Sequence, residues 1–473
     1  MASTFFGLEI GRSGLVAHQK ALDVAGQNMA NASTPGYSRQ RAEIATTYPF
    51  TDPSFVRENT AGQMGTGVEV TAVLRIRDQL IDNQIQDKTS SLGYWEARQQ
   101  MLDKMESIVN EPSDANIRTD IDQFWVAIQK LADNPRSIPI RSALRQQTLT
   151  LATTIREDYA SIKNLRKDAN DYIKQDVSEI NRIAAEIADL NVQIGKVTAI
   201  GDHPNDLMDK RDSLLEELAK MINISHVTDK LNKMTVYVGG IPLVDGDSAN
   251  SIIMENNPQD DNMVRLKWKQ PSGQEVQILS GELQGLFQIR DYDIPKVLNN
   301  LNDFAATLID KVNSLHRTGF GLDESTGNDF FAGINAEDID LSAALKDGEE
   351  GLNRIAASES ILKLPGDNTI MQGIYELKHT PVLTNGTSTF NDFIGAVVTE
   401  IGELSSTAKT KAENQEALIG NLDLRRESVC GVNLDEEMTD MVRFQHGYNA
   451  SAKIISTMDA MLDVLINQLK TSP

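Results

Sequence analysis

The chain of 473 residues has few of the side chains on which sites of covalent chemistry depend. A single cysteine, Cys430, excludes an intramolecular disulfide and a cysteine-based zinc site. The six histidines are scattered and form no H-E-x-x-H pair, and neither a phosphate-binding G-x-x-x-x-G-K-[ST] loop nor a G-x-S-x-G elbow occurs. Aromatic residues make up only 5% of the chain, which is low for a large enzyme with deep pockets. We therefore expect no enzyme activity, no catalytic residue, no cofactor and no metal.

Basic charge and long apolar runs are scarce as well. The formal net charge is −23, with 68 acidic against 45 basic residues, and no basic stripe with interleaved aromatics occurs, so nucleic acid is an improbable partner. No stretch approaches the roughly 20 apolar residues of a membrane helix, so membrane insertion is not expected. The first residues, Met-Ala-Ser-Thr-Phe-Phe, lack the basic region of a cleaved secretion signal.

Heptad repeats are what the chain does have, one at each end. Apolar residues recur every seven positions at Leu8, Leu15, Leu22 and Met29, and again at Leu434, Met441, Tyr448, Ile455, Leu462 and Leu469. This period is typical of a helix that packs along another helix. We therefore predict that the two ends of the chain meet in a coiled coil.

Between the heptads, the pattern predicts a helical rod interrupted by strands. Apolar spacing indicates a helix of nearly 60 residues that begins near Pro139 and is reversed at 201–204. From about 222 to 289 the period changes to two, with a hairpin signal at Gly239-Gly240 and alternation at 264–268 and at 276–278. Shorter helices are expected over 337–429, broken by a loop at 381–389.

The expected fold is therefore mainly α with an inserted antiparallel β-domain, in an elongated multidomain chain with a terminal coiled coil and a long helical-bundle rod. The predicted units are an N-terminal coiled-coil helix with an extended segment, two parts of the rod, the β-domain at the far tip, and a C-terminal coiled-coil helix. Their ranges are 1–72, 73–221, 222–290, 291–429 and 430–473, of which the first and last pair with each other. Cys430 is expected to be a small buried residue at a helix junction.

Both ends also carry a resemblance to a known family. The segments 13–15 and 21–37 resemble the N-terminal signature of bacterial flagellar axial proteins, which include rod, hook and hook-associated proteins. The segments 432–438 and 444–455 resemble their C-terminal signature. The residues Tyr37-Ser38-Arg39-Gln40, the long helical middle and the segment 316–320 resemble the hook-associated members in particular.

This resemblance implies a structural subunit of the flagellum that forms the junction between hook and filament and is needed for filament assembly. The implied partners are copies of itself, the hook protein, a neighbouring hook-associated protein and an export chaperone. The implied location is extracellular, in the flagellum, reached by type III export without a cleaved signal peptide. The residues expected at the assembly interface are the heptad residues together with Asn28, Asn31, Thr34, Gly36, Tyr37 and Phe444.

Two other interpretations remain open at this stage. Another axial subunit, of rod or hook, would share both terminal signatures, although the middle of such proteins is rich in strands. A cytosolic coiled-coil scaffold would explain the heptads but not the signature around Asn28 and Tyr37.

Overall fold

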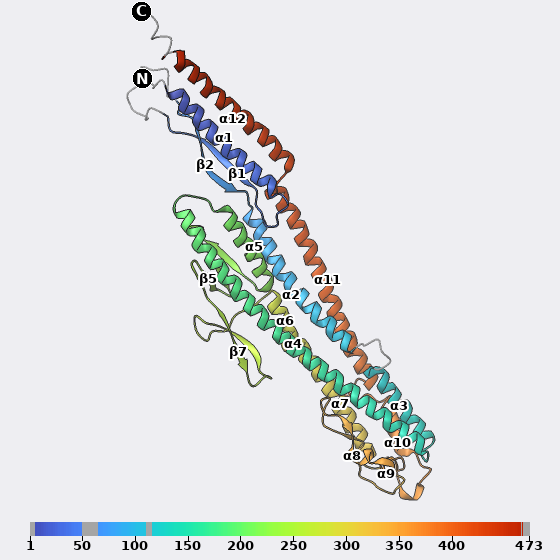
Figure 1. Cartoon of the computed structure of the whole chain (residues 1–473). Helices are drawn as coiled ribbons and strands as arrows, with labels where there is room; N and C mark the ends of the chain where they lie inside the picture. The colour runs from blue at the N-terminus through green and yellow to red at the C-terminus, as the bar shows by residue number, and fades with distance from the viewer. Residues whose placement is uncertain (1–4, 50–64, 110–115, 465, 467–473) are drawn as a thin grey trace, which may run out of the picture.

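The computed structural model describes residues 5–49, 65–109, 116–464 and 466. The molecule is elongated, and the described ends of the chain lie at the same pole (Figure 1). From that pole the chain runs out through α2 (Gln79–Val109) and α3 (Ile117–Asp133) and returns through α4 (Ile138–Ala199). After α5 (Asn205–Met221) and the strands, it runs out again through α6 (Glu282–Gln288), a π-helical turn (Ile289–Asp293) and α7 (Ile294–His316). Finally α11 (Phe390–Cys430) leads back to the first pole.

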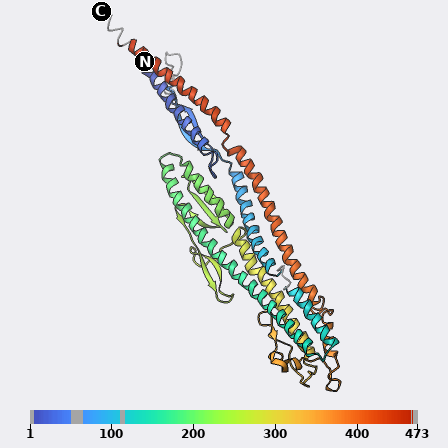
Figure 2. The same cartoon turned by 45° about the vertical axis from the view of Figure 1, so that its right-hand side comes forward.

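The two ends form one structural unit. Helix α1 (Phe6–Ala30) lies along α12 (Leu434–Asp463), as the heptads predict (Figures 1 and 2). Strands β1 (Gln40–Thr46) and β2 (Val68–Arg75) pair antiparallel, with a bulge between Glu43 and Ile44, and contact α1. We call α1, β1, β2 and α12 the terminal unit, and the helices from α2 to α11 the rod.

The long helix predicted in the rod is present as α4, which has 62 residues and is about 93 Å long at 1.5 Å per residue. Its apolar positions at helical spacing are fully buried, among them Leu144, Leu151, Ile155 and Ile162. One buried apolar cluster extends from Ala97 to Ala408 and joins α4 to the other rod helices. No helix of the described residues is long and apolar enough to cross a membrane.

The strands of the middle form two small antiparallel sheets. One has the order β3 (Ser225–Thr228), β4 (Met234–Val238), β5 (Ile241–Asp245), β6 (Ser248–Ala249), and the other pairs β7 (Ile252–Asn257) with β8 (Met263–Trp268). The hairpin predicted at Gly239-Gly240 is confirmed, and both glycines have the positive φ, 57° and 82°, that a tight primed turn requires.

Three expectations about the middle are wrong. The alternation at Val276 and Ile278 does not make a strand: Glu275 forms one isolated bridge with Lys267, and both apolar side chains pack against the core from irregular chain. The predicted β-region also contains α6, which starts after Gly281 at φ 91°. The β-domain is not at the far tip but lies beside α4 and α5 (Figures 1 and 2), because α4 is the returning leg of the rod and delivers the chain back toward the terminal unit.

A fourth expectation, that of short helices before Cys430, is also wrong, because α11 is one helix of 41 residues. It packs on α2, but beyond Ala412 only Cys430 is buried, so its amphipathic signal is weak. The expected loop precedes it, and Thr389 caps its start by accepting a hydrogen bond from Asp392 N. Cys430 is its last residue and is buried as expected, and burial raises the pKa of the thiol.

The far pole consists of short elements. These are β9 (Phe331–Ala332), β10 (Asp340–Leu341), α8 (Ala343–Lys346), α9 (Gly348–Asn353), a 3-10 turn (Ile361–Lys363) and α10 (Thr369–Glu376). His316, which ends α7, is buried there: its Nε2 accepts the Ala356 N–H at 2.9 Å and its Nδ1 lies 2.8 Å from Asn328 O. Burial lowers the pKa of His316 to about 4, so the ring is neutral and serves the fold of the pole.

Candidate assembly interface

The contact between α1 and α12 is made on the α1 side by small residues. Gly11, Gly14, Ala17, Ala21 and Ala25 are buried on α1. A Cβ on Gly11 would lie 2.8 Å from Ile455 Cγ1, and one on Gly14 would lie 2.7 Å from Ser451 Oγ. Real Cβ atoms do not approach so closely, so the glycines allow the two helices to pack at short range.

The same close packing is found with the roles reversed farther along the helices. A Cβ on Gly447 of α12 would lie 2.5 Å from Nε2 of His18 on α1. The His18 ring also faces Phe444, with ring centroids 6.4 Å apart. His18 therefore fills the space that a glycine leaves, and no group of metal-binding side chains surrounds it among the described residues.

Most heptad residues lie beside this seam and are only partly buried. Leu8, Leu15, Leu22 and Met29 are each half-buried on α1, in contrast to the buried glycines and alanines beside them. On α12, Ile455 meets Gly11 in the seam, and Met441, Phe444, Tyr448 and Leu462 are half-buried. Leu434 is half exposed, and Leu469 lies outside the described residues. Contact of these side chains with neighbouring subunits stays a prediction.

Asn28 joins four segments of the terminal unit. It is 1% exposed, and its Oδ1 accepts hydrogen bonds from Tyr37 Oη at 2.8 Å and from Gln40 N at 2.9 Å. Its Nδ2 donates to Gln40 O at 2.8 Å and to Glu437 Oε2 at 3.1 Å. One buried amide with every bond satisfied thus holds α1, the following turn, β1 and α12 in a single register.

A second set of polar contacts supports Asn28. The buried Glu437 also accepts from Arg39 Nε at 2.7 Å, and Arg39 reaches Glu436 with its other end at 2.9 Å. Burial raises the pKa of Tyr37, and the carboxylates of Asp206, Asp209 and Glu437 raise it further, so its hydroxyl remains a donor.

The remaining signature residues have local roles in the structure. Asn31 donates from Nδ2 to Gln27 O at 3.0 Å, and Thr34 donates to Asn31 Oδ1 at 3.2 Å. Gly36 is exposed and has a φ of 78°, which favours glycine. These three residues shape the turn that follows α1.

The segment after Tyr37 also ties the terminal unit to α5 of the rod. Ser38 donates to Asp209 from both N and Oγ, at 3.1 and 2.7 Å. Gln40 Nε2 donates to Asp206 Oδ1 at 3.1 Å, and Asn205 Nδ2 donates to Gln40 Oε1 at 3.0 Å. The α5 partners Asn205, Asp206 and Asp209 were not predicted from the sequence, although all three lie near the start of an amphipathic helix.

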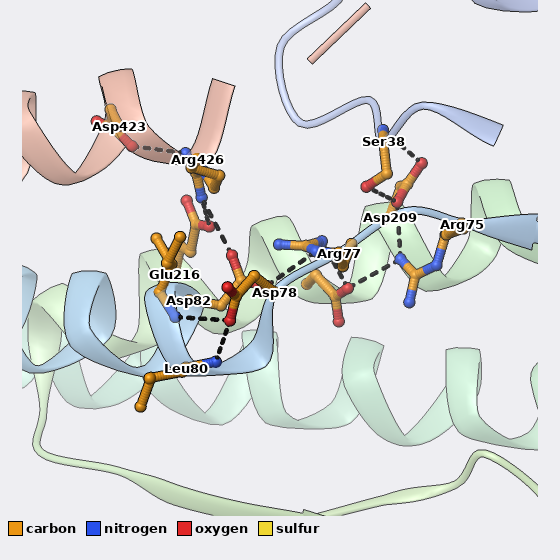
Figure 3. Close-up of polar contacts among 12 residues, drawn as sticks. Ser38, Arg75, Arg77, Asp78, Leu80, Asp82, Asp209, Glu216, Asp423 and Arg426 are labelled. Atoms are coloured by element: carbon orange, nitrogen blue, oxygen red, sulfur yellow. Dashed lines mark hydrogen bonds and ion pairs between the residues drawn. The ribbon is translucent and has the colours of Figure 1, made fainter. Parts of the chain in front are cut away.

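A chain of ion pairs continues from this contact into the rod (Figure 3). Arg75 pairs with Asp209 at 2.7 Å and with Asp212 at 2.9 Å, and Asp212 also pairs with Arg77 at 2.7 Å. Arg77 reaches Asp82 of α2 at 3.0 Å. Burial acts to lower the pKa of Arg77, but the neighbouring carboxylates outweigh it and raise that pKa. None of these arginines and aspartates was singled out from the sequence, because single charges carry no periodic signal.

Three models of protein families match parts of this chain. The model described as "Flagellar hook-associated protein FlgK helical domain" matches residues 102–331. "Flagella basal body rod protein" matches 8–37, and "Flagellar basal body rod FlgEFG protein C-terminal" matches 428–469.

Whole-chain relatives agree with these matches. "Flagellar hook-associated protein 1" of Bacillus subtilis (strain 168) is 30% identical over 514 aligned residues, covering 99% of each chain. The protein of the same name from Escherichia coli (strain K12) is 24% identical and covers 96% of this chain and 98% of that protein. The flagellar hook junction protein FlgK from Burkholderia pseudomallei has a similar structure, with a TM-score of 0.64 at 15% identity over 73% of this chain and 100% of that chain. At that identity the likeness shows the fold alone.

Proposed function

The chain belongs to the family of flagellar hook-associated protein 1, a structural and non-enzymatic family of the flagellum, and we propose that it assembles with copies of itself at the junction between hook and filament. In this role the assembled copies contact the hook lattice on one side and the filament lattice on the other. It is needed for filament assembly because the filament attaches to the hook through it.

The observation that carries this proposal is the apolar surface of α12. Leu434, Met438 and Val442 are 50%, 54% and 53% exposed at successive turns of the helix, and Ile454 and Met461 are also exposed. Only Glu437 and Ser451 of this helix are buried. A helix with so much apolar surface in water is stabilised when neighbouring subunits cover it, so the terminal unit is suited to a tube of packed helices.

The matched regions favour a hook-associated role over the two alternatives. Models of rod proteins match only the two ends, at 8–37 and 428–469, which agrees with terminal signatures shared across axial proteins. The middle matches the helical domain of a hook-associated protein, which a rod or hook subunit does not require. A cytosolic scaffold has no need for either end signature.

The finer partners follow from this position. We expect the hook protein on one side, a neighbouring hook-associated protein on the other, and a dedicated chaperone before export. Export in an unfolded state through a type III channel is compatible with a chain whose single cysteine leaves no disulfide to re-form.

Immunoelectron microscopy tests the proposal. A strain whose only copy of this chain carries an epitope tag at an exposed position of the β-domain should show label in one narrow band between hook and filament. Deletion of the gene should leave hooks without filaments, and the tagged copy should restore them. Label along the whole hook would support the hook alternative, and filaments on the deletion strain would contradict the junction role.

A further inference from the structure

We propose that the terminal unit and the rod are two bodies joined by a hinge, and that the ion pairs of Arg75 with Asp209 and Asp212 act as a latch on that hinge. The hinge would set the tilt of the terminal helices against the rod. The inference rests on the contacts between the two bodies and not on the proposed function.

Apolar packing does not continue across the joint. The buried apolar cluster of the rod runs from Ala97 to Ala408 and, among the described residues, includes none from α1, β1, β2 or α12. The apolar residues buried in the terminal unit, such as Ala17, Ala21 and Val24, lie outside that cluster. Interdigitated apolar side chains resist relative motion, whereas a polar interface between domains permits it.

The covalent connections across the joint are two short segments. Residues 76–78 lead from β2 into α2, and residues 431–433 lead from α11 into α12. At the second, Gly431 and Asn433 are extended, with ψ of 158° and 111°, and the Asn433 side chain caps α12 as a new helix. The backbone bonds that link these segments to the turn after α1 are Ile76 N to Arg39 O at 2.8 Å and Arg39 N to Cys430 O at 3.3 Å. Few backbone angles therefore need to change for the two bodies to rotate.

Polar side chains hold the joint in its present position (Figure 3). Arg75, at the end of β2, binds two carboxylates of α5, and Ser38 binds one of the same carboxylates. The Arg75 side chain keeps 12% of its surface exposed, and that of Asp212 keeps 16%. Because these side chains are largely buried, added salt screens the pairs little, whereas removal of one partner leaves the other charge unpaired and opens the latch.

A groove beside the latch gives the terminal unit room to move. It has a volume of about 1100 Å³ and lies between α1 and β2 on one side and the turn at 201–207 on the other. Val16, Val70 and Leu207 are among its lining residues. The contact that spans its edge, from Gln27 Nε2 to Asp206 Oδ1, is long at 3.4 Å and exposed. If the proposed junction role holds, such a hinge would let the terminal helices stay in one lattice while the rod follows the other.

Pulsed electron paramagnetic resonance measures this hinge directly. In the full chain with Cys430→Ala, spin labels at Glu69→Cys on β2 and Asp202→Cys after α4 report the width of the groove. A reference pair at Ser178→Cys and Asp202→Cys lies entirely within the rod. At about 0.05 M salt the groove pair should show one narrow distance. Arg75→Gln should broaden that distribution at least about twofold and leave the rod pair unchanged.

Two controls keep the result interpretable. Arg182→Gln removes an exposed ion pair within α4, with a side chain 51% exposed, and should leave both distributions as in the parent chain. If Arg75→Gln disturbs the rod pair, Asp212→Asn serves as the second latch variant. A groove distribution that stays narrow in the latch variants would overturn the hinge, and one that is equally broad in the parent chain would overturn the latch.

Discussion

Asn28 on α1 donates a hydrogen bond to Glu437 on α12 at 3.1 Å, although 409 residues separate the two in sequence. Both side chains are almost completely buried, at 1% and 2% exposed. The bond places the first helix of the chain in register with the last, and Tyr37, Arg39 and Gln40 complete the network around it. Replacing a buried amide that hydrogen-bonds a buried carboxylate is expected to lower the stability of the terminal unit.

Asn28→Asp is expected to loosen the terminal unit without affecting the rod. The new carboxylate would face Glu437 at hydrogen-bond distance, and Glu437 would lose the amide donor from which it accepts. We expect this to cost on the order of 3 kcal/mol of stability of the terminal unit. Hydrogen exchange of α1 and α12 amides in assembled protein should speed up, and rod amides should not change. Asn31→Ala, which removes two local hydrogen bonds, to Gln27 and from Thr34, and none to α12, is the matched control. Equal protection of α1 in Asn28→Asp and the parent chain would contradict the register role.

Gly11→Val tests the close approach of α1 to α12. The Cβ would lie 2.8 Å from Ile455 Cγ1, so overpacking should cost about 1–3 kcal/mol of helix pairing. Ile455→Ala in the same chain should recover part of that loss, because it removes the atom that clashes. Gly26→Ala is the control, since a Cβ there meets nothing within 4 Å and improves helix propensity. Assembly of purified subunits, followed by sedimentation, gives the order of the variants; equal assembly of Gly11→Val and Gly26→Ala would refute the seam.

We predict that Asp176 lowers the stability of the rod at alkaline pH. Burial and the nearby Glu282 raise the pKa of Asp176 to about 7, and its Oδ2 is shielded with no hydrogen-bond partner among the described residues. Because the folded pKa lies above the unfolded value, this group's contribution to stability is greatest near pH 4 and falls as pH rises through 7. Asp176→Asn should therefore stabilise the rod at pH 8 by on the order of 2 kcal/mol and little at pH 4. Urea unfolding at both pH values measures the difference, and an equal effect at the two would exclude titration of Asp176 as its cause.

The sequence was informative where a feature repeats along a helix and uninformative where it depends on which elements meet. The helix α4 was predictable because its apolar residues match the helical period, as at Leu144, Leu151, Ile155 and Ile162. The hairpin was predictable from the two glycines at 239 and 240, because few other residues adopt the positive φ that its turn requires. These are local signals that tertiary contacts did not override.

The composition of the seam shows the opposite case. The heptad leucines are conspicuous in the sequence, but α1 packs tightly against α12 at Gly11 and Gly14, where the lack of a side chain allows the close approach. Their importance depends on the size of Ile455 and Ser451 on a helix more than 400 residues away. The spacing of Gly7, Gly11 and Gly14 was the available signal. The ion pairs of Arg75 gave none, since a lone arginine looks the same on any surface.

The most direct test of the central claim, that paired terminal helices build the junction, is electron microscopy of cells whose only copy carries Leu22→Asp or Ile455→Asp. A charge at Leu22, beside the seam, or at Ile455, within it, would face apolar neighbours and cost on the order of 3 kcal/mol if unpaired. The rod should still fold, because its apolar core contains no residue of α1 or α12 among those described. Leu22→Met, which keeps volume and polarity, is the control. We predict hooks without filaments, and flagellin in the medium, for both aspartate variants and normal filaments for Leu22→Met. Normal filaments on cells with either aspartate variant would contradict the account.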